Sequence, residues 1–259
     1  MKKILGTLLA AFLLTPHVSV AAEVQNMRFT QEGDKRIASY DLVGEGNEQK
    51  AEVTVVITVD GQVLATKDLK VTGDVGKNTQ VGPDKRIVWD AAADLPKEFD
   101  GKVTWEVKAT SAAEAAAAEL SSMGIDPAKA IVIGSGPNYV IEFMDPYCPY
   151  SRKAFEYLEN RSDLSRYVVL SCKVHPDACP VVSYILTASD RTDAYQKVMS
   201  GKLDGLAMSI PSAEGDSLRD EHQKIADDNK VKGYPTLIVN GTRITGWSRD
   251  GVEKIVGQR

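Results

Sequence analysis

The sequence of 259 residues predicts two folded domains of different classes, an N-terminal all-β sandwich and a C-terminal α/β domain. Within residues 24–109, the stretches 52–59 and 102–109 alternate apolar and polar side chains with the period of β-strands. Residues 111–122 are rich in alanine, and from about residue 128 strand-like and helix-like segments alternate. The predicted divisions are a signal peptide (1–22), the sandwich (23–110), a helical linker (111–127) and the α/β domain (128–259).

The first 22 residues have the pattern of a bacterial-type secretory signal peptide. Residues 1–3 are basic, residues 4–14 are apolar and uncharged, and residues 20–22 are small, as a cleavage site requires. Retention as a membrane anchor is the alternative, although the apolar run is short for a bilayer span. We therefore expect a periplasmic or otherwise secreted protein, cleaved near Ala22 and without stable membrane insertion.

The expected mature chain is acidic. Without Lys2 and Lys3 it holds 29 basic residues against 36 acidic ones, a net charge of −7. Such a surface disfavours nucleic acids and anionic membranes as partners. No cofactor is expected.

The N-terminal domain is predicted to consist of short strands joined by tight turns. Apolar residues alternate along 53–59, and Asp60-Gly61 predicts a hairpin turn. The predicted strands are 53–59, 62–65, 86–89 and 103–109, and the predicted loop before 86–89 contains Gly73, Gly76, Gly82 and Pro83. About six or seven such strands indicate an immunoglobulin-like or fibronectin-III-like sandwich with Trp89 and Trp105 in its core. The sandwich alone would also fit a structural component of the cell envelope.

The alanine-rich segment 111–122 predicts a helix between the domains. Ser111 and Glu114 have the spacing of a capping box, and Gly124 is a plausible end. A linker helix and a dimerisation helix are both compatible with the pattern, but its apolar face is mostly alanine, which favours the linker.

The C-terminal domain is predicted to be mixed α/β. The expected strands are 131–133, 139–144, 166–172, 233–239 and 242–247, and the expected helices are 150–160, 177–188, 190–201, 214–230 and 249–256. The order strand–helix–strand, followed by a late hairpin and a helix, limits the topology to a small number of α/β folds.

Cys148 is the strongest candidate for a reactive residue. It follows an apolar strand and precedes a helix, and the positive end of a helix favours a thiolate over a thiol. The thiolate is the attacking species in disulfide exchange. The usual redox pattern places a second cysteine three residues later, but here that residue is Ser151.

The other two cysteines, Cys172 and Cys179, are close in sequence. An odd number of cysteines in an exported protein predicts one disulfide and one free thiol. A structural disulfide between these two would contribute roughly 2.5 kcal/mol. Two alternatives remain: one of them resolves a mixed disulfide on Cys148, or both bind a metal with His175, although three ligands are few for zinc. Otherwise His175 and His222 are expected to be solvated.

Residues 143–150 (FMDPYCPY) and 233–236 (GYPT) resemble the thioredoxin-fold thiol–disulfide exchange proteins, and most of all the periplasmic DsbC/DsbG branch. The resemblance covers about residues 128–257. It implies a thioredoxin-like fold, Cys148 as the nucleophile and a cis Pro235 packed opposite it. It also implies that Tyr234 offers backbone groups to an extended substrate, so that the substrate-binding residues are Tyr234, Pro235, Pro149 and Tyr150.

Ser151 departs from the family pattern and limits the chemistry that we expect. Without a second cysteine, Cys148 can still isomerise a disulfide, reduce a sulfenic acid or exchange a mixed disulfide, and the Ser151 hydroxyl can donate to its thiolate. The expected partners are exported proteins with thiols or disulfides, and a reducing thiol protein in the periplasm or membrane. The alternative function is a peptide-binding or chaperone module without turnover.

Glu142 lies six residues before Cys148, where thioredoxin-like proteins often hold a buried carboxylate. It is either a buried proton relay with a raised pKa or a solvent-facing side chain on an edge strand. Asp145, three residues before Cys148, is predicted to form the turn before Pro146.

Overall fold

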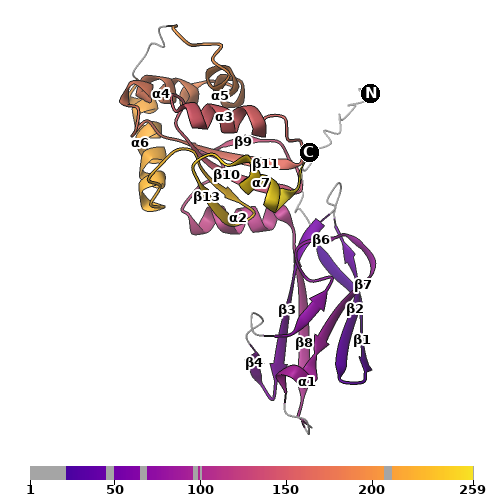
Figure 1. The fold of residues 1–259 in the computed structure, drawn as a ribbon. Helices are drawn as coiled ribbons and strands as arrows, with labels where there is room; N and C mark the ends of the chain where they lie inside the picture. The colour runs from indigo at the N-terminus through magenta and orange to yellow at the C-terminus, as the bar shows by residue number, and fades with distance from the viewer. Residues whose placement is uncertain are drawn as a thin grey trace, which may run out of the picture.

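The computed structural model describes residues 22–258 except 45–49, 65–68, 96–98, 100 and 207–211. The predicted signal peptide therefore lies outside the described residues, except for Ala22. Figure 1 shows an all-β part followed by an α/β part. The elements of the first part are β1 (Glu23–Glu32), β2 (Lys35–Val43), β3 (Lys50–Val59), β4 (Gln62–Leu64), β5 (Val71–Gly73), β6 (Gly76–Gln80), β7 (Gly82–Asp90), α1 (Ala91–Asp94) and β8 (Val103–Thr110).

These strands form two antiparallel sheets over one apolar core. One sheet has the order β1-β2-β7-β5, and in the other β3 pairs with β4, β6 and β8. The inward residues of β3 are fully buried, as the alternation predicts, and they pack with Tyr40 and Trp89. Trp105 is half-buried and meets Trp89 edge-on with ring centroids 5.8 Å apart. Assignment of this sandwich to the immunoglobulin-like class stays a prediction.

The segment around Gly73, Gly76 and Gly82 was expected to be a loop, and that expectation is wrong. It contains β5, which pairs with β7, and β6, which pairs with β3. All three glycines have positive φ and are end residues of strands: Gly73 ends β5, Gly76 begins β6 and Gly82 begins β7.

The second part is built on one five-stranded sheet. Its elements are α2 (Ala112–Ser122), β9 (Ile131–Ile133), β10 (Asn138–Met144), α3 (Pro149–Leu158), β11 (Leu164–Leu170), the 3₁₀ helix η2 (Pro176–Ala178), α4 (Cys179–Thr187), α5 (Arg191–Met199), α6 (Ala213–Asp228), β12 (Thr236–Val239), β13 (Thr242–Thr245) and α7 (Arg249–Val256). The strand order is β13-β12-β10-β11-β9, with β10 and β11 parallel and the other pairs antiparallel. This parallel β-α-β unit followed by a hairpin and a helix is the predicted thioredoxin-like order. None of the helices described here is long and apolar enough to span a membrane.

Helix α2 is present with its predicted capping box of Ser111 and Glu114. It does not stand free between the two parts, because Ala116 and Leu120 are buried in one cluster with Tyr139 of β10. The helix expected to be a linker therefore packs on the sheet of the second part.

Side chains on the two faces of this sheet belong to two separate clusters. One includes Val140 and Met144 with residues of α3, α4, α5 and α7. The other includes Ile141 and Phe143 with residues of α2 and α6. Cys148 belongs to the second cluster and Cys172 to the first, so the two sulfurs are associated with opposite faces.

Candidate functional site

Cys148 occupies the N-cap position of α3, immediately after the turn that ends β10. Pro149 at the first helical position lacks an N–H group and has the right φ for a helix start, which explains why the helix begins here. The first turn has no acidic side chain and no side-chain cap, so no charge within that turn offsets the positive end of the helix beside the sulfur. The residue is only 7% exposed.

The thiol faces a segment that lies 86 residues later in the chain. Cys148 Sγ donates a hydrogen bond of 3.2 Å to the carbonyl oxygen of Tyr234. The next peptide bond, Tyr234–Pro235, is cis, as predicted. Both residues are buried, and β12 begins directly after them. The structure therefore places the backbone of Tyr234 against the thiol. That Tyr234 offers its backbone groups to a substrate stays a prediction.

The predicted substrate-binding residues separate into two groups. Tyr234 and Pro235 are buried under the thiol, whereas Pro149 and Tyr150 are on the surface. The Tyr150 ring is 59% exposed and carries Lys153 Nζ 5.6 Å from its centroid. Tyr147 is also exposed. An aromatic surface thus borders the thiol, and its contact with substrate stays a prediction.

Ser151 is fully buried in the first turn of α3. Its hydroxyl oxygen accepts a 3.3 Å hydrogen bond from the backbone N–H of Asp145. The expected bond from Ser151 to the Cys148 sulfur does not occur among the contacts of the described residues. Ser151 therefore stabilises the turn before α3.

Asp145 forms the predicted turn, since its Oδ1 accepts the N–H of Tyr147 at 2.9 Å. Asp145 also contacts His175, which the sequence did not indicate. Oδ2 accepts the backbone N–H of His175 at 3.2 Å and lies 3.0 Å from Nδ1 of the same residue. The expectation of a solvated His175 is therefore wrong. The parallel pairing of β10 and β11 causes this, because their following loops meet at one edge of the sheet.

Glu142 is fully buried on the central strand β10, so the edge-strand alternative is wrong. Its carboxylate forms two hydrogen bonds with Arg166 of β11, through Nε and through Nη2 at 3.0 Å, and Tyr195 Oη lies 3.4 Å away. Burial and then the Glu142 charge raise the pKa of Tyr195 well above its usual value. Burial alone would lower the pKa of Arg166, but Glu142 raises it above its ordinary value. A proton-relay role for Glu142 stays a prediction.

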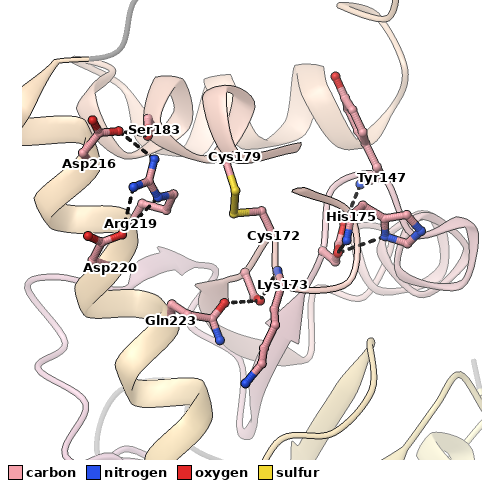
Figure 2. The surroundings of a disulfide bond; sticks show 12 residues. Tyr147, Cys172, Lys173, His175, Cys179, Ser183, Asp216, Arg219, Asp220 and Gln223 are labelled. Carbon is pink, nitrogen blue, oxygen red and sulfur yellow. Dashed lines mark hydrogen bonds and ion pairs between the residues drawn. A yellow bond between two sulfur atoms is a disulfide. The ribbon is translucent and has the colours of Figure 1, made fainter. Parts of the chain in front are cut away.

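Cys172, just after β11, and Cys179, at the start of α4, form a disulfide (Figure 2). Cys148 is the free cysteine. With both sulfurs of the pair bonded to each other, a Cys/His/Cys metal site is not available in this state. No group of His, Cys, Asp and Glu that could hold a metal ion occurs in the described part of the chain.

His222 was also expected to be solvated, and that expectation is wrong. It is 1% exposed on α6. Nδ1 accepts the backbone N–H of Leu170 at 3.0 Å, and Nε2 lies 3.2 Å from the Lys129 carbonyl oxygen. Burial lowers the pKa of His222 to about 4. The many charged residues of α6 suggested that His222 faces solvent. Its spacing from the buried Ile225 and Ala226 could have indicated that it lies on the inward face of the helix.

Comparison with known proteins gives remote structural similarity only. No protein-family model matches the sequence, and no curated protein does. A disulfide interchange protein from Neisseria gonorrhoeae matches with 24% identity and a TM-score of 0.44, over 52% of this chain and 100% of that one. A linker-deletion variant of Proteus mirabilis ScsC matches with 18% identity and a TM-score of 0.46, over 55% and 79%. A protein from Pseudomonas syringae described as a protein-disulfide isomerase matches with 18% identity and a TM-score of 0.39, over 50% and 99%. At these values the similarities do not assign the chain to a family or transfer an activity to it.

Proposed function

We propose that this chain is a single-thiol thiol–disulfide exchange protein that acts through Cys148. One observation carries the proposal: the Cys148 thiol sits at the N-terminus of α3 and donates to the carbonyl of Tyr234, directly before a cis proline. The partial positive charge of the helix N-terminus lies beside the sulfur, and the Tyr234 carbonyl is the acceptor of its S–H group.

The chemistry needs one thiolate. Cys148 Sγ attacks one sulfur of a substrate disulfide, forms a mixed disulfide with it, and releases the other substrate sulfur as a thiolate. A different substrate thiolate then attacks the substrate sulfur of the mixed disulfide and displaces Cys148 as a thiolate. Electrons balance without an external oxidant or reductant, and the net result is isomerisation. Alternatively, a partner protein with two thiols completes the exchange. One partner thiolate attacks the Cys148 sulfur and releases the substrate as a dithiol, and the second partner thiolate then displaces Cys148, so the substrate disulfide is reduced and the partner dithiol becomes a disulfide.

The finer features of the proposal follow from the sequence. The N-terminal pattern favours export, and the Cys172–Cys179 disulfide fits an oxidising compartment. The motif around Cys148 favours the DsbC/DsbG branch, and the sandwich is proposed to be immunoglobulin-like. The disulfide is assigned a structural role, because Cys172 and Cys148 belong to clusters on opposite faces of the sheet.

The test is the reaction of the purified chain with a peptide that contains a mispaired disulfide. We expect a mixed disulfide on Cys148, detected by mass spectrometry, followed by release of correctly paired peptide. Cys148→Ser should abolish both steps. If the unaltered protein reacts no faster than free cysteine at about pH 6, where a thiolate stabilised by the helix would stand out, the proposal is rejected.

A second candidate is a peptide-binding module without turnover. The observation in its favour is the exposure of Tyr147 and Tyr150 beside a thiol that is itself almost covered. Cys148→Ser separates the two functions, because binding of an unlabelled extended peptide should survive the substitution whereas exchange should not. Binding without any mixed disulfide in the unaltered protein would favour this candidate.

A further inference from the structure

We infer that His175 is a positioning residue for Cys148, which it controls through the carboxylate of Asp145. The inference rests on the proposed exchange activity. It begins from Asp145, which contacts the reactive turn at several points. The backbone carbonyl of Asp145 accepts the N–H of Cys148 at 3.0 Å, its own N–H donates to Ser151, and its carboxylate accepts the N–H of Tyr147. The orientation of Asp145 therefore fixes the residues on both sides of the thiol.

The Asp145 side chain is 0% exposed, so it needs partners that replace water. One is the local N–H of Tyr147. Among the described residues, two further hydrogen bonds reach the Asp145 carboxylate from a distant segment, and both come from His175. A substitution that removes the imidazole leaves the buried carboxylate with two backbone N–H partners and one fewer hydrogen bond, and the turn is then free to rearrange to restore the solvation of the carboxylate.

His175 is itself held in place. Ser171 N–H donates to the Met144 carbonyl at 2.9 Å, which extends the pairing of β11 with β10 up to the residue before Asp145. The Cys172–Cys179 disulfide closes the loop that follows, and η2 begins right after His175, whose carbonyl accepts the Ala178 N–H at 2.9 Å. Figure 2 shows the disulfide, His175 and Tyr147 in this region. The disulfide is thereby connected to the reactive turn through His175.

Positioning matters because exchange requires the helix N–H groups and the sulfur to stay aligned while charge moves onto and off the sulfur. A supporting residue that fixes such a turn raises the rate without touching the substrate. Three substitutions at position 175 differ in whether they can keep the hydrogen bond to Asp145. Asn at position 175 can place its amide nitrogen near the position of Nδ1, whereas Gln reaches further and Ala has no donor.

The test measures the second-order rate constant of Cys148 with a chromogenic aryl disulfide, for the full chain and its variants at one pH. We expect H175A and H175Q to react about tenfold more slowly than the unaltered protein, as loss of one strong hydrogen bond would give, and H175N to stay within about twofold. The control D177A changes an exposed residue of the same loop and should also stay within about twofold.

The outcomes separate this inference from the proposed function. If the unaltered protein does not react, the proposed function fails and His175 is not at issue. If it reacts and H175A matches it, the inference is overturned. H175N as slow as H175A also overturns it, since the bond to Asp145 would then not be the cause. If H175A does not fold, H175N and H175Q decide: a tenfold difference supports the inference, and equal rates reject it.

Discussion

Glu142 and Arg166 form a buried ion pair between the two parallel strands β10 and β11, with side chains 0% and 2% exposed. The pair lies on the sheet face of Val140 and Met144, whereas Cys148 belongs to the cluster of the other face. The pair can therefore have a purely stabilising role, and this can be tested against the proton-relay role that the sequence predicts for Glu142.

We expect Glu142→Gln to lower the free energy of unfolding by about 3–5 kcal/mol, because it leaves the Arg166 charge buried and unpaired. The double variant Glu142→Leu, Arg166→Met should be clearly less destabilised than this single variant. Urea unfolding measures both. A slower exchange reaction in Glu142→Gln at unchanged stability would instead favour the relay.

His222 predicts an acid-dependent loss of stability. Its pKa is about 4 in the folded chain and near 6.5 when unfolded, so the unfolded state binds the proton more readily. The stabilising contribution is complete above pH 6.5 and is lost as the pH falls towards 4, by about 3 kcal/mol in all. In His222→Gln, the free energy of unfolding should therefore fall less steeply between pH 6.5 and pH 4 than in the unaltered protein. Parallel curves for the two proteins would contradict the prediction.

The Ser111 cap predicts a modest effect on stability. Its hydroxyl accepts the N–H of Glu114 at 3.1 Å, and the Glu114 carboxylate accepts the N–H of Ser111 at 2.9 Å. Ser111→Ala should cost about 1 kcal/mol in urea unfolding, because α2 packs on the sheet and unfolds with it. Ser121→Ala, an exposed change at the other end of α2, is the control and should have little effect.

The disulfide predicts a defined cysteine map. Non-reducing peptide mapping should give one linked peptide pair with Cys172 and Cys179, and Cys148 free or bound to a small thiol. Replacing both linked cysteines by Ala should lower stability by roughly 2.5 kcal/mol. A bridge that includes Cys148 would show that one of the pair serves as a resolving cysteine.

Local patterns predicted much of this structure. The alternation of Val53, Val55 and Ile57 specified strand β3, and the spacing of Ser111 and Glu114 specified the start of α2. Cys148 and Pro235 were linked through motif resemblance, and the structure brings Cys148 against Tyr234, the residue before that proline. These features depend on residues close in sequence or on a recognisable pair of motifs.

The features that were missed depend on contacts between distant segments. Nothing near His175 in sequence shows that its loop returns to Asp145, because that contact arises from the parallel strands before each residue. Likewise, Arg166 looks like a surface residue within an apolar strand until Glu142 is placed beside it. Gly73, Gly76 and Gly82 suggested a loop because glycine is common in turns. The sequence does not show that this segment pairs with β3 and β7, since those strands are brought together with it only by folding.

The passage from β8 to α2 has a mechanical consequence. The chain leaves the sandwich at Thr110 and enters the helix at Ala112, so Ser111 alone joins them, and that residue is held by the capping box. Lys77 of the sandwich also donates to the carbonyl of Asn240 beside β12, at 2.8 Å. A swing of one half against the other would break the Lys77 bond, whereas the capping-box bonds lie within residues 111–114 and do not join the two halves. The sandwich and the second part are therefore joined by a connection of one residue, not by a long tether, and a hydrogen bond between distant segments adds to it.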